Sequence, residues 1–142
     1  MTTSRASAVW EGKLKDGRGQ YRASSGTFTG PYSFQTRFES ASGSTPEELI
    51  AAAHASCLSM ALSADLEKAG TPAVRIETEA ACTIEPVGGK PTITGMALTV
   101  RGQVPGLDQP GFRKAAEGAR DNCPVSRALQ GNVSFSLDAR LE

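Results

Sequence analysis

Three cysteines carry the reactive chemistry that this sequence offers. Cys57 lies in the alanine-rich run AAAHASCLSM, Cys82 lies in a segment of alternating residues, and Cys123 directly precedes Pro124. A thiolate can act as a nucleophile, as a metal ligand or as the starting point of reversible oxidation. The wide spacing excludes a Cys-x-x-Cys redox motif and the closely paired ligands of a zinc ribbon. Each thiol therefore has to be judged by its own surroundings.

Cys57 and Cys123 differ in their position relative to predicted helices. Cys57 falls in the middle of a helix, away from the positive N-terminal end, so its thiolate needs a cation from elsewhere. Cys123 precedes a proline that starts a short helix, and this N-cap-like position favours an accessible thiolate. The competing interpretations are an apolar core residue for Cys57 and a buried loop residue for Cys123.

Cys82 and His54 have further interpretations. Cys82 is in phase with the apolar face of its strand, so we expect it in the core. His54 is the only histidine, and a Cys-His pair with Cys57 or a metal site with all three cysteines is conceivable. However, helix neighbours at i, i+3 rarely direct both reactive atoms at one substrate. A packing or hydrogen-bonding role is favoured for this histidine.

Length and composition favour one globular domain over residues 1–142. The 15 basic and 15 acidic residues give a formal net charge of zero, without the basic excess that nucleic-acid binding needs. No apolar run approaches the roughly 20 residues that span a bilayer, and the first residues lack the apolar core of a signal peptide. We therefore expect a cytoplasmic protein with no nucleic-acid or membrane partner, in which cysteines form no structural disulfide framework.

The first forty residues are predicted to form β structure. Aromatic residues alternate from Thr27 to Phe38, and Gly26 and the Gly30-Pro31 pair interrupt the pattern. A polar serine-rich loop follows before the next element.

The clearest element is a helix from about Pro46 to Ala69. Thr45 is a good N-cap, the following proline suits the first helical position, and Glu48 completes a capping box. Gly70 marks its end. Because His54 is the only ionisable residue in the middle of this helix, we expect the helix to be buried all round.

Strands and helices alternate in the remaining sequence. The expected segments are strands at Val74–Ile84 and Ile93–Val104 with a bulge at Gly95, helices at Pro110–Arg120 and Val125–Gln130, and a last strand from Val133. This order of elements predicts an α+β domain.

Two segments resemble the cysteine motifs of the OsmC/Ohr family. The run TPEELIAAAHASC, which ends at Cys57, is similar to the central-helix motif, and DNCPVS around Cys123 is similar to the second cysteine signature. The segment GPYSFQTRF, which contains Arg37, resembles the OsmC branch rather than the Ohr branch. The resemblance extends from about Trp10 to Phe135. It implies an OsmC-like α+β fold, with antiparallel sheets wrapped around the long central helices of an intertwined homodimer.

The resemblance also implies a thiol peroxidase that reduces organic hydroperoxides. The apolar helix surface around Cys57 favours organic hydroperoxides, so hydrogen peroxide would be reduced more weakly. Cys57 would attack the peroxide and become a sulfenic acid, and Cys123 would condense with it to give a disulfide. Arg37 would stabilise the Cys57 thiolate, and Glu47 would hold Arg37 through a bidentate ion pair. An external dithiol, of lipoyl type or similar, would restore both thiols. No metal, flavin or haem cofactor is implied.

Helix geometry adds a prediction about assembly. Glu47 and Cys57 are ten residues apart on one helix, hence about 15 Å apart along its axis. If both serve one site, Glu47 should come from a second subunit whose helix runs antiparallel. A two-fold axis near Ala52 would then create two sites at the interface of a homodimer.

Three other functions remain open. A redox sensor or sulfur carrier could use the same cysteines without efficient peroxide turnover. A binding or structural protein would contain unreactive cysteines. A hydrolase with Cys57 as its nucleophile lacks a suitable base.

Overall fold

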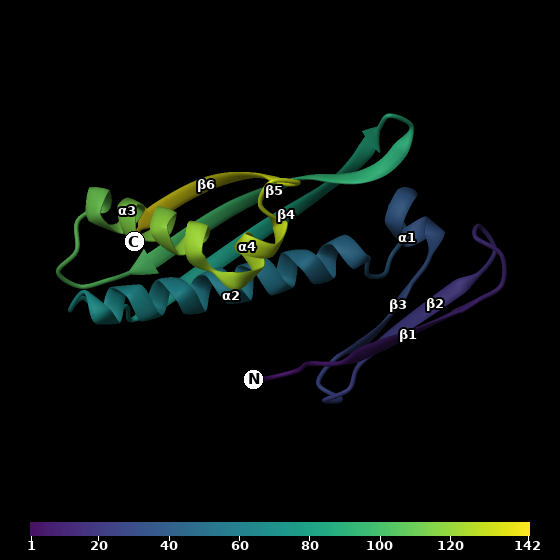
Figure 1. The fold of residues 1–142 in the computed structure, drawn as a ribbon, viewed down its shortest axis with the longest axis horizontal. Helices are drawn as coiled ribbons and strands as arrows, with labels where there is room; N and C mark the ends of the chain where they lie inside the picture. The colour runs from purple at the N-terminus through teal and green to yellow at the C-terminus, as the bar shows by residue number, and fades with distance from the viewer. The chain divides into compact units, whose positions relative to one another are not determined.

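The computed structural model of the protein describes all residues from Met1 to Glu142. The chain divides into two compact units, Met1–Leu49 and Ile50–Glu142 (Figure 1). The first unit contains a small sheet and a short helix, and the second contains another sheet, most of the long helix and two shorter helices. This mixture confirms the predicted α+β class. The assignment of both units to a single domain stays a prediction.

The sheet of the first unit is antiparallel throughout. Strands β1 (Ala6–Glu11), β2 (Arg18–Ala23) and β3 (Thr29–Tyr32) are hydrogen-bonded in that order. Gly12 has a φ of 94°, a left-handed conformation that glycine adopts without steric cost, and it begins the turn after β1. The predicted β structure is confirmed as far as Tyr32.

The segment after β3 is helical, which corrects the prediction of a strand to Phe38. Residues Phe34–Phe38 form helix α1. The Ser33 side chain accepts a hydrogen bond from the Thr36 N–H at 3.1 Å, and the Thr36 side chain accepts one from the Ser33 N–H at 2.9 Å. This capping box outweighs the alternation of aromatic residues, because it satisfies N–H groups that a helix start leaves unpaired. Arg37 therefore lies on a helix.

The long helix α2 spans Pro46–Lys68 and agrees with the predicted bounds. The hydroxyl oxygen of Thr45 accepts a hydrogen bond from the N–H of Glu48 at 3.0 Å, as the predicted cap requires. Gly70 has a φ of 85°, the conformation that commonly follows a helix end. Glu47 and Glu48 lie in the first turn, where negative charge stabilises a helix.

The sheet of the second unit has the strand order β4-β5-β6. Strand β4 (Arg75–Val87) alternates between half-buried and exposed residues for most of its length, as predicted. Strand β5 (Lys90–Gln103) pairs antiparallel with it, and the register shifts beside Gly95. The predicted bulge is thereby confirmed.

Strand β6 (Ser134–Leu141) pairs with β5 in parallel, which corrects the expectation of purely antiparallel sheets. Helices α3 (Gln109–Asn122) and α4 (Pro124–Leu129) lie between the two strands in the sequence. A connection of this length carries the chain back to the same end of the sheet, as parallel pairing requires.

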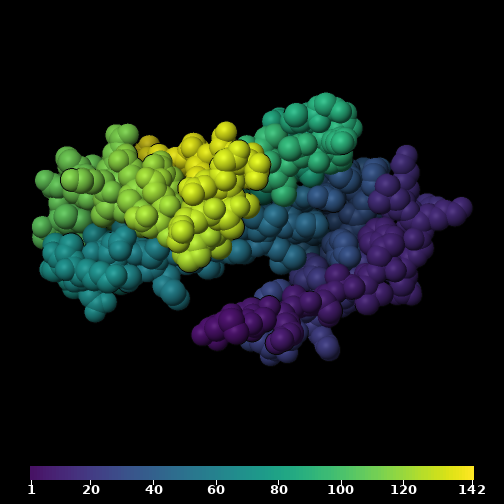
Figure 2. All heavy atoms as spheres, in the orientation of Figure 1, coloured from purple at the N-terminus to yellow at the C-terminus, as the bar shows by residue number.

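The core of the second unit joins α2, α3 and the sheet. It contains Leu58, Leu62 and Leu66 of α2, Met96, Leu98 and Val100 of β5, and Phe112, Ala116 and Ala119 of α3, among others. Figure 2 shows the atoms of α3 and α4, in green to yellow, beside the teal atoms of α2. This packing fixes the part of α2 that carries Cys57 and the junction of α3 and α4 that carries Cys123.

Within a single chain, α2 buries one face and exposes the other, whereas the sequence predicts burial all round. The exposed residues in its middle are Ala52, Ala53, Ser56, Met60 and Ser63. The rest of the second unit covers one face only, and Met60 is 76% exposed. Helix α2 is long and apolar enough to cross a membrane, which the sequence analysis missed. This test considers length and composition only, and helices in the core of soluble proteins also pass it. The exposed stripe is uncharged, which is typical of a surface that another molecule covers.

Candidate active site

The second unit brings Cys57 and Cys123 together. Cys57 lies on α2, and Cys123 joins α3 to α4 as the N-cap of α4. The Cys57 thiol lies close enough to interact with the Cys123 thiol and with the backbone of Val125. Neither residue is in a disulfide; Cys57 is partly exposed, whereas Cys123 is buried. Two cysteines from distant parts of the sequence thus form a reduced dithiol.

The surroundings within the second unit disfavour a Cys57 thiolate. Burial is the main cause that raises the pKa of Cys57; the hydrogen bond with the Val125 backbone opposes it, and the neighbouring Cys123 thiol raises the pKa further. A thiol with a raised pKa is largely protonated at neutral pH and is a poor nucleophile. A cation beside Cys57 would lower its pKa and favour the thiolate. The mid-helix position of Cys57 leads to the same expectation, because the helix itself supplies no positive charge there.

Cys123 is held by Ser126 and, through Ser126, by His54. The sulfur of Cys123 accepts a hydrogen bond from the Ser126 N–H at 3.4 Å and lies 3.1 Å from the Ser126 hydroxyl oxygen. That oxygen lies 2.7 Å from Nε2 of His54. All three residues are 0% exposed. The predicted N-cap position of Cys123 is confirmed, but its predicted accessibility is wrong, because the side chain turns inward to Ser126.

His54 has the hydrogen-bonding role that its lone position in an alanine-rich helix predicts. Besides its contact with Ser126, its ring packs against Phe135 with 5.1 Å between the ring centroids. Burial lowers the pKa of His54, so the imidazole is neutral at physiological pH. The sequence offered no signal for Ser126 beyond its place in the DNCPVS motif.

Arg37 and Glu47 form an ion pair within the first unit. Nε and Nη2 of Arg37 donate hydrogen bonds to Oε1 of Glu47 at 2.9 and 2.6 Å. Both donors thus reach one carboxylate oxygen, whereas the resemblance implies a bidentate pair. The other oxygen, Oε2, is buried and has no hydrogen-bond partner within the chain. The carboxylate fixes a guanidinium that stays 36% exposed and can meet a further anionic group.

An apolar pocket of about 320 Å³ opens beside Arg37. Its other lining residues are Trp10, Leu14, Tyr32, Ser33, Phe34, Phe38 and Pro46. The guanidinium carbon of Arg37 lies 5.4 Å from the centre of the Phe38 ring, so the charge lies against an aromatic wall. The sequence analysis missed this pocket, because the aromatic residues were assigned to a strand. Their clustering around a single arginine was the available signal.

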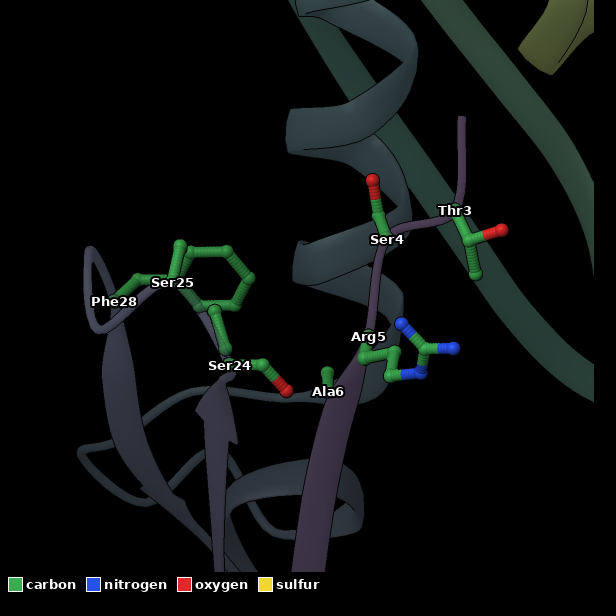
Figure 3. A pocket seen from close by; sticks show the side chains of 8 residues that line it. Thr3, Ser4, Arg5, Ala6, Ser24, Ser25 and Phe28 are labelled. Atoms are coloured by element: carbon green, nitrogen blue, oxygen red, sulfur yellow. The ribbon is translucent and has the colours of Figure 1, made fainter. Parts of the chain in front are cut away.

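A larger pocket of the first unit lacks such chemistry. It measures about 610 Å³ and lies between the segment that leads into β1 and the loop from β2 to β3 (Figure 3). Arg5 is the only ionisable residue that lines it, beside small residues and Phe28. Because this pocket contains no thiol and no acid–base pair, we do not assign it to catalysis.

Cys82 lies on β4, and its half-buried side chain packs against the core, as predicted. No group of three or more histidine, cysteine, aspartate or glutamate side chains is arranged to hold a metal ion. The conceivable four-ligand site of His54 and the three cysteines is therefore not formed. The candidate groups are the dithiol of the second unit and the ion pair of the first.

Comparison with known proteins identifies relatives over most of the chain. Residues 39–138 match the family model described as OsmC-like protein. The chain is 42% identical over 136 residues to peroxiredoxin OsmC of Escherichia coli (strain K12). This match covers 95% of this chain and 94% of that protein. It is 31% identical over 98 residues to the organic hydroperoxide resistance protein of Xanthomonas axonopodis pv. citri, covering 67% and 66%.

Solved structures share the fold. A protein of Legionella pneumophila, described as an organic hydroperoxide resistance protein OsmC, matches with a TM-score of 0.81 at 21% identity, covering 98% of this chain and 97% of that chain. OhrB of Bacillus subtilis matches with a TM-score of 0.77 at 23% identity, covering 96% and 98%. The family model, the relatives and the fold agree with the two cysteine motifs: this chain belongs to the OsmC-like family.

Proposed function

We propose that the protein is a thiol peroxidase in which Cys57 attacks an organic hydroperoxide and Cys123 resolves the product. The contact between a partly exposed and a buried thiol carries this proposal. The partly exposed Cys57 can meet a dissolved peroxide, whereas the buried Cys123 is placed to meet Cys57. Relatives named peroxiredoxin and organic hydroperoxide resistance protein support the same class of reaction.

The proposed reaction needs two bond exchanges. The Cys57 thiolate attacks the terminal oxygen of the hydroperoxide, the O–O bond breaks, and the alkoxide takes up a proton and leaves as an alcohol. Cys123 then attacks the sulfenic sulfur of Cys57, so a disulfide forms and the hydroxyl group leaves as water. An external dithiol of lipoyl type, or a similar one, reduces the disulfide by thiol–disulfide exchange.

Arg37 is the proposed cation for the first step. Its positive charge would stabilise the Cys57 thiolate and the developing alkoxide, which the surroundings of Cys57 within its own unit do not. Glu47 holds the guanidinium in one orientation. The apolar pocket beside Arg37 would take the organic part of the hydroperoxide. Hydrogen peroxide has no such part and would react more weakly.

We assign the two halves of each site to different subunits of a homodimer. Glu47 and Cys57 are ten residues apart on α2, so one straight helix separates them by about 15 Å. An antiparallel copy of α2 would bring the Arg37–Glu47 pair to Cys57 and would cover the uncharged exposed stripe.

Mixed dimers provide a sharp test of this assignment. At neutral pH the Arg37→Met homodimer should be strongly impaired and the Cys57→Ser homodimer nearly inactive, because every site lacks one of the two groups. After subunit exchange, a heterodimer has one site with both groups intact, so activity should return. Dithiol-dependent peroxide consumption measures the recovery, and mixing two Cys57→Ser preparations is the matched control. No recovery in verified heterodimers would mean that Arg37 acts on Cys57 of its own chain.

Peroxide turnover tests the function itself. We expect the native protein with a lipoyl-type dithiol to consume cumene hydroperoxide faster than hydrogen peroxide. Stable formation of the Cys57–Cys123 disulfide with slow turnover would instead indicate a redox sensor or a sulfur carrier. Thiols that resist both peroxide and a small alkylating agent under native conditions would indicate a binding or structural protein.

A further inference from the structure

We infer that His54 and Ser126 activate Cys123 for the second step, with Ser126 donating a hydrogen bond to the Cys123 sulfur and His54 orienting Ser126. This inference rests on the proposed function, because it concerns the resolving thiol. Ser126 touches a reacting atom, whereas His54 acts through Ser126 and is a positioning residue.

The three side chains form a continuous buried chain of contacts. The Cys123 sulfur lies 3.1 Å from the Ser126 hydroxyl oxygen, and that oxygen lies 2.7 Å from Nε2 of His54. His54 comes from α2, one helical turn before Cys57, and Ser126 comes from α4. The edge-on contact with Phe135 fixes the plane of the imidazole ring. With 0% exposure of all three residues, water does not compete for these hydrogen bonds.

The direction of the hydrogen bonds follows from the ring nitrogen that has no partner. Nδ1 of His54 is buried and makes no hydrogen bond. A proton on Nδ1 would leave a buried N–H donor unsatisfied, which is rarer in proteins than an unsatisfied acceptor. We therefore assign the proton of the neutral ring to Nε2, which donates to the Ser126 oxygen. The single hydroxyl proton of Ser126 is then directed to the Cys123 sulfur.

This arrangement matters when Cys123 becomes an anion. The Cys123 thiol loses its proton, its electron pair forms the S–S bond with Cys57, and the S–O bond breaks with its electrons on oxygen. That oxygen takes up a proton and leaves as water, so protons and electrons balance. A buried thiolate is costly unless donors surround it, and Ser126 supplies both its N–H and its O–H. The attack of Cys57 on peroxide does not need these donors.

Single-turnover kinetics separate the two steps. Native protein and variants react with one equivalent of cumene hydroperoxide, while a dimedone-type probe reports sulfenic acid and mass spectrometry reports the disulfide. Ser126→Ala removes the hydroxyl but keeps the N–H, and His54→Leu removes the orienting donor. For both we expect sulfenic acid formation at the native rate and disulfide formation slowed by about 10- to 100-fold. His54→Gln, which restores an N–H donor, should return disulfide formation to near the native rate.

The outcomes distinguish this inference from the proposed function. A native rate of disulfide formation in Ser126→Ala would overturn the inference and leave the peroxidase intact. Equal slowing in His54→Gln and His54→Leu would also overturn it, because packing rather than hydrogen bonding would then be responsible. A native protein that forms no sulfenic acid would overturn the proposed function, and the inference with it.

Discussion

Replacement of Cys57 by serine should lower dithiol-dependent consumption of cumene hydroperoxide by at least about 1,000-fold. Serine is close to cysteine in size and can also form hydrogen bonds, but it lacks the nucleophilic sulfur that accepts oxygen from the peroxide. Since Cys57 is the partly exposed member of the dithiol, Cys123 should not replace it as the attacking group. Steady-state assays with saturating dithiol measure the effect.

Cys82→Ser is the matched control for this loss. Cys82 packs against the core of the same unit from β4, so its replacement should leave peroxide consumption near the native rate. Substantial activity in Cys57→Ser, or a comparable loss in Cys82→Ser, would contradict the assignment of Cys57 as the attacking thiol.

Replacement of Arg37 by methionine should have the second largest effect. Without the guanidinium, the Cys57 pKa stays above its ordinary value, because burial and Cys123 raise it. A raised pKa means less thiolate at neutral pH and more as the pH increases. We expect peroxide consumption at neutral pH to fall by about 10- to 1,000-fold, with partial recovery at alkaline pH. A pH series of single-turnover rates measures both features.

Glu47→Gln should lower peroxide consumption less than Arg37→Met does. The substitution weakens the interaction that orients the Arg37 guanidinium, but it keeps the positive charge of Arg37. Arg75→Met is the control, since Arg75 forms an exposed ion pair with Glu77 at 2.9 Å and should not affect catalysis.

A uniform loss of activity in Arg37→Met at all pH values would contradict a role of Arg37 in stabilising the Cys57 thiolate.

The sequence predicted elements best where local signals were complete. Thr45 at the start and Gly70 at the end were sufficient to place α2. Helix α1 was missed because Ser33 and Thr36 form a capping box without the usual glutamate or glutamine. The parallel placement of β6 was missed because strand direction depends on how α3 and α4 return the chain, which periodicity does not encode.

The parts of the candidate site that lie within sequence motifs could be predicted from the sequence, whereas contacts between distant residues could not. The two cysteine motifs predicted the roles of Cys57 and Cys123, and the structure places these thiols in contact. The contact of His54 with Ser126 joins residues 72 positions apart, which no local pattern reveals. Likewise, the buried position of Cys123 reflects its contact with Ser126, whose hydroxyl group meets His54 of α2, and not the N-cap position alone.

The most direct test of the central claim is to map the products after one equivalent of cumene hydroperoxide reacts with the reduced protein in the absence of dithiol. Peptide mass spectrometry should then show a disulfide between Cys57 and Cys123 in the native protein. In Cys123→Ser it should show a trapped sulfenic acid at Cys57. Unmodified thiols in the native protein, or a first oxidation at Cys82 or Cys123 instead of Cys57, would contradict the account.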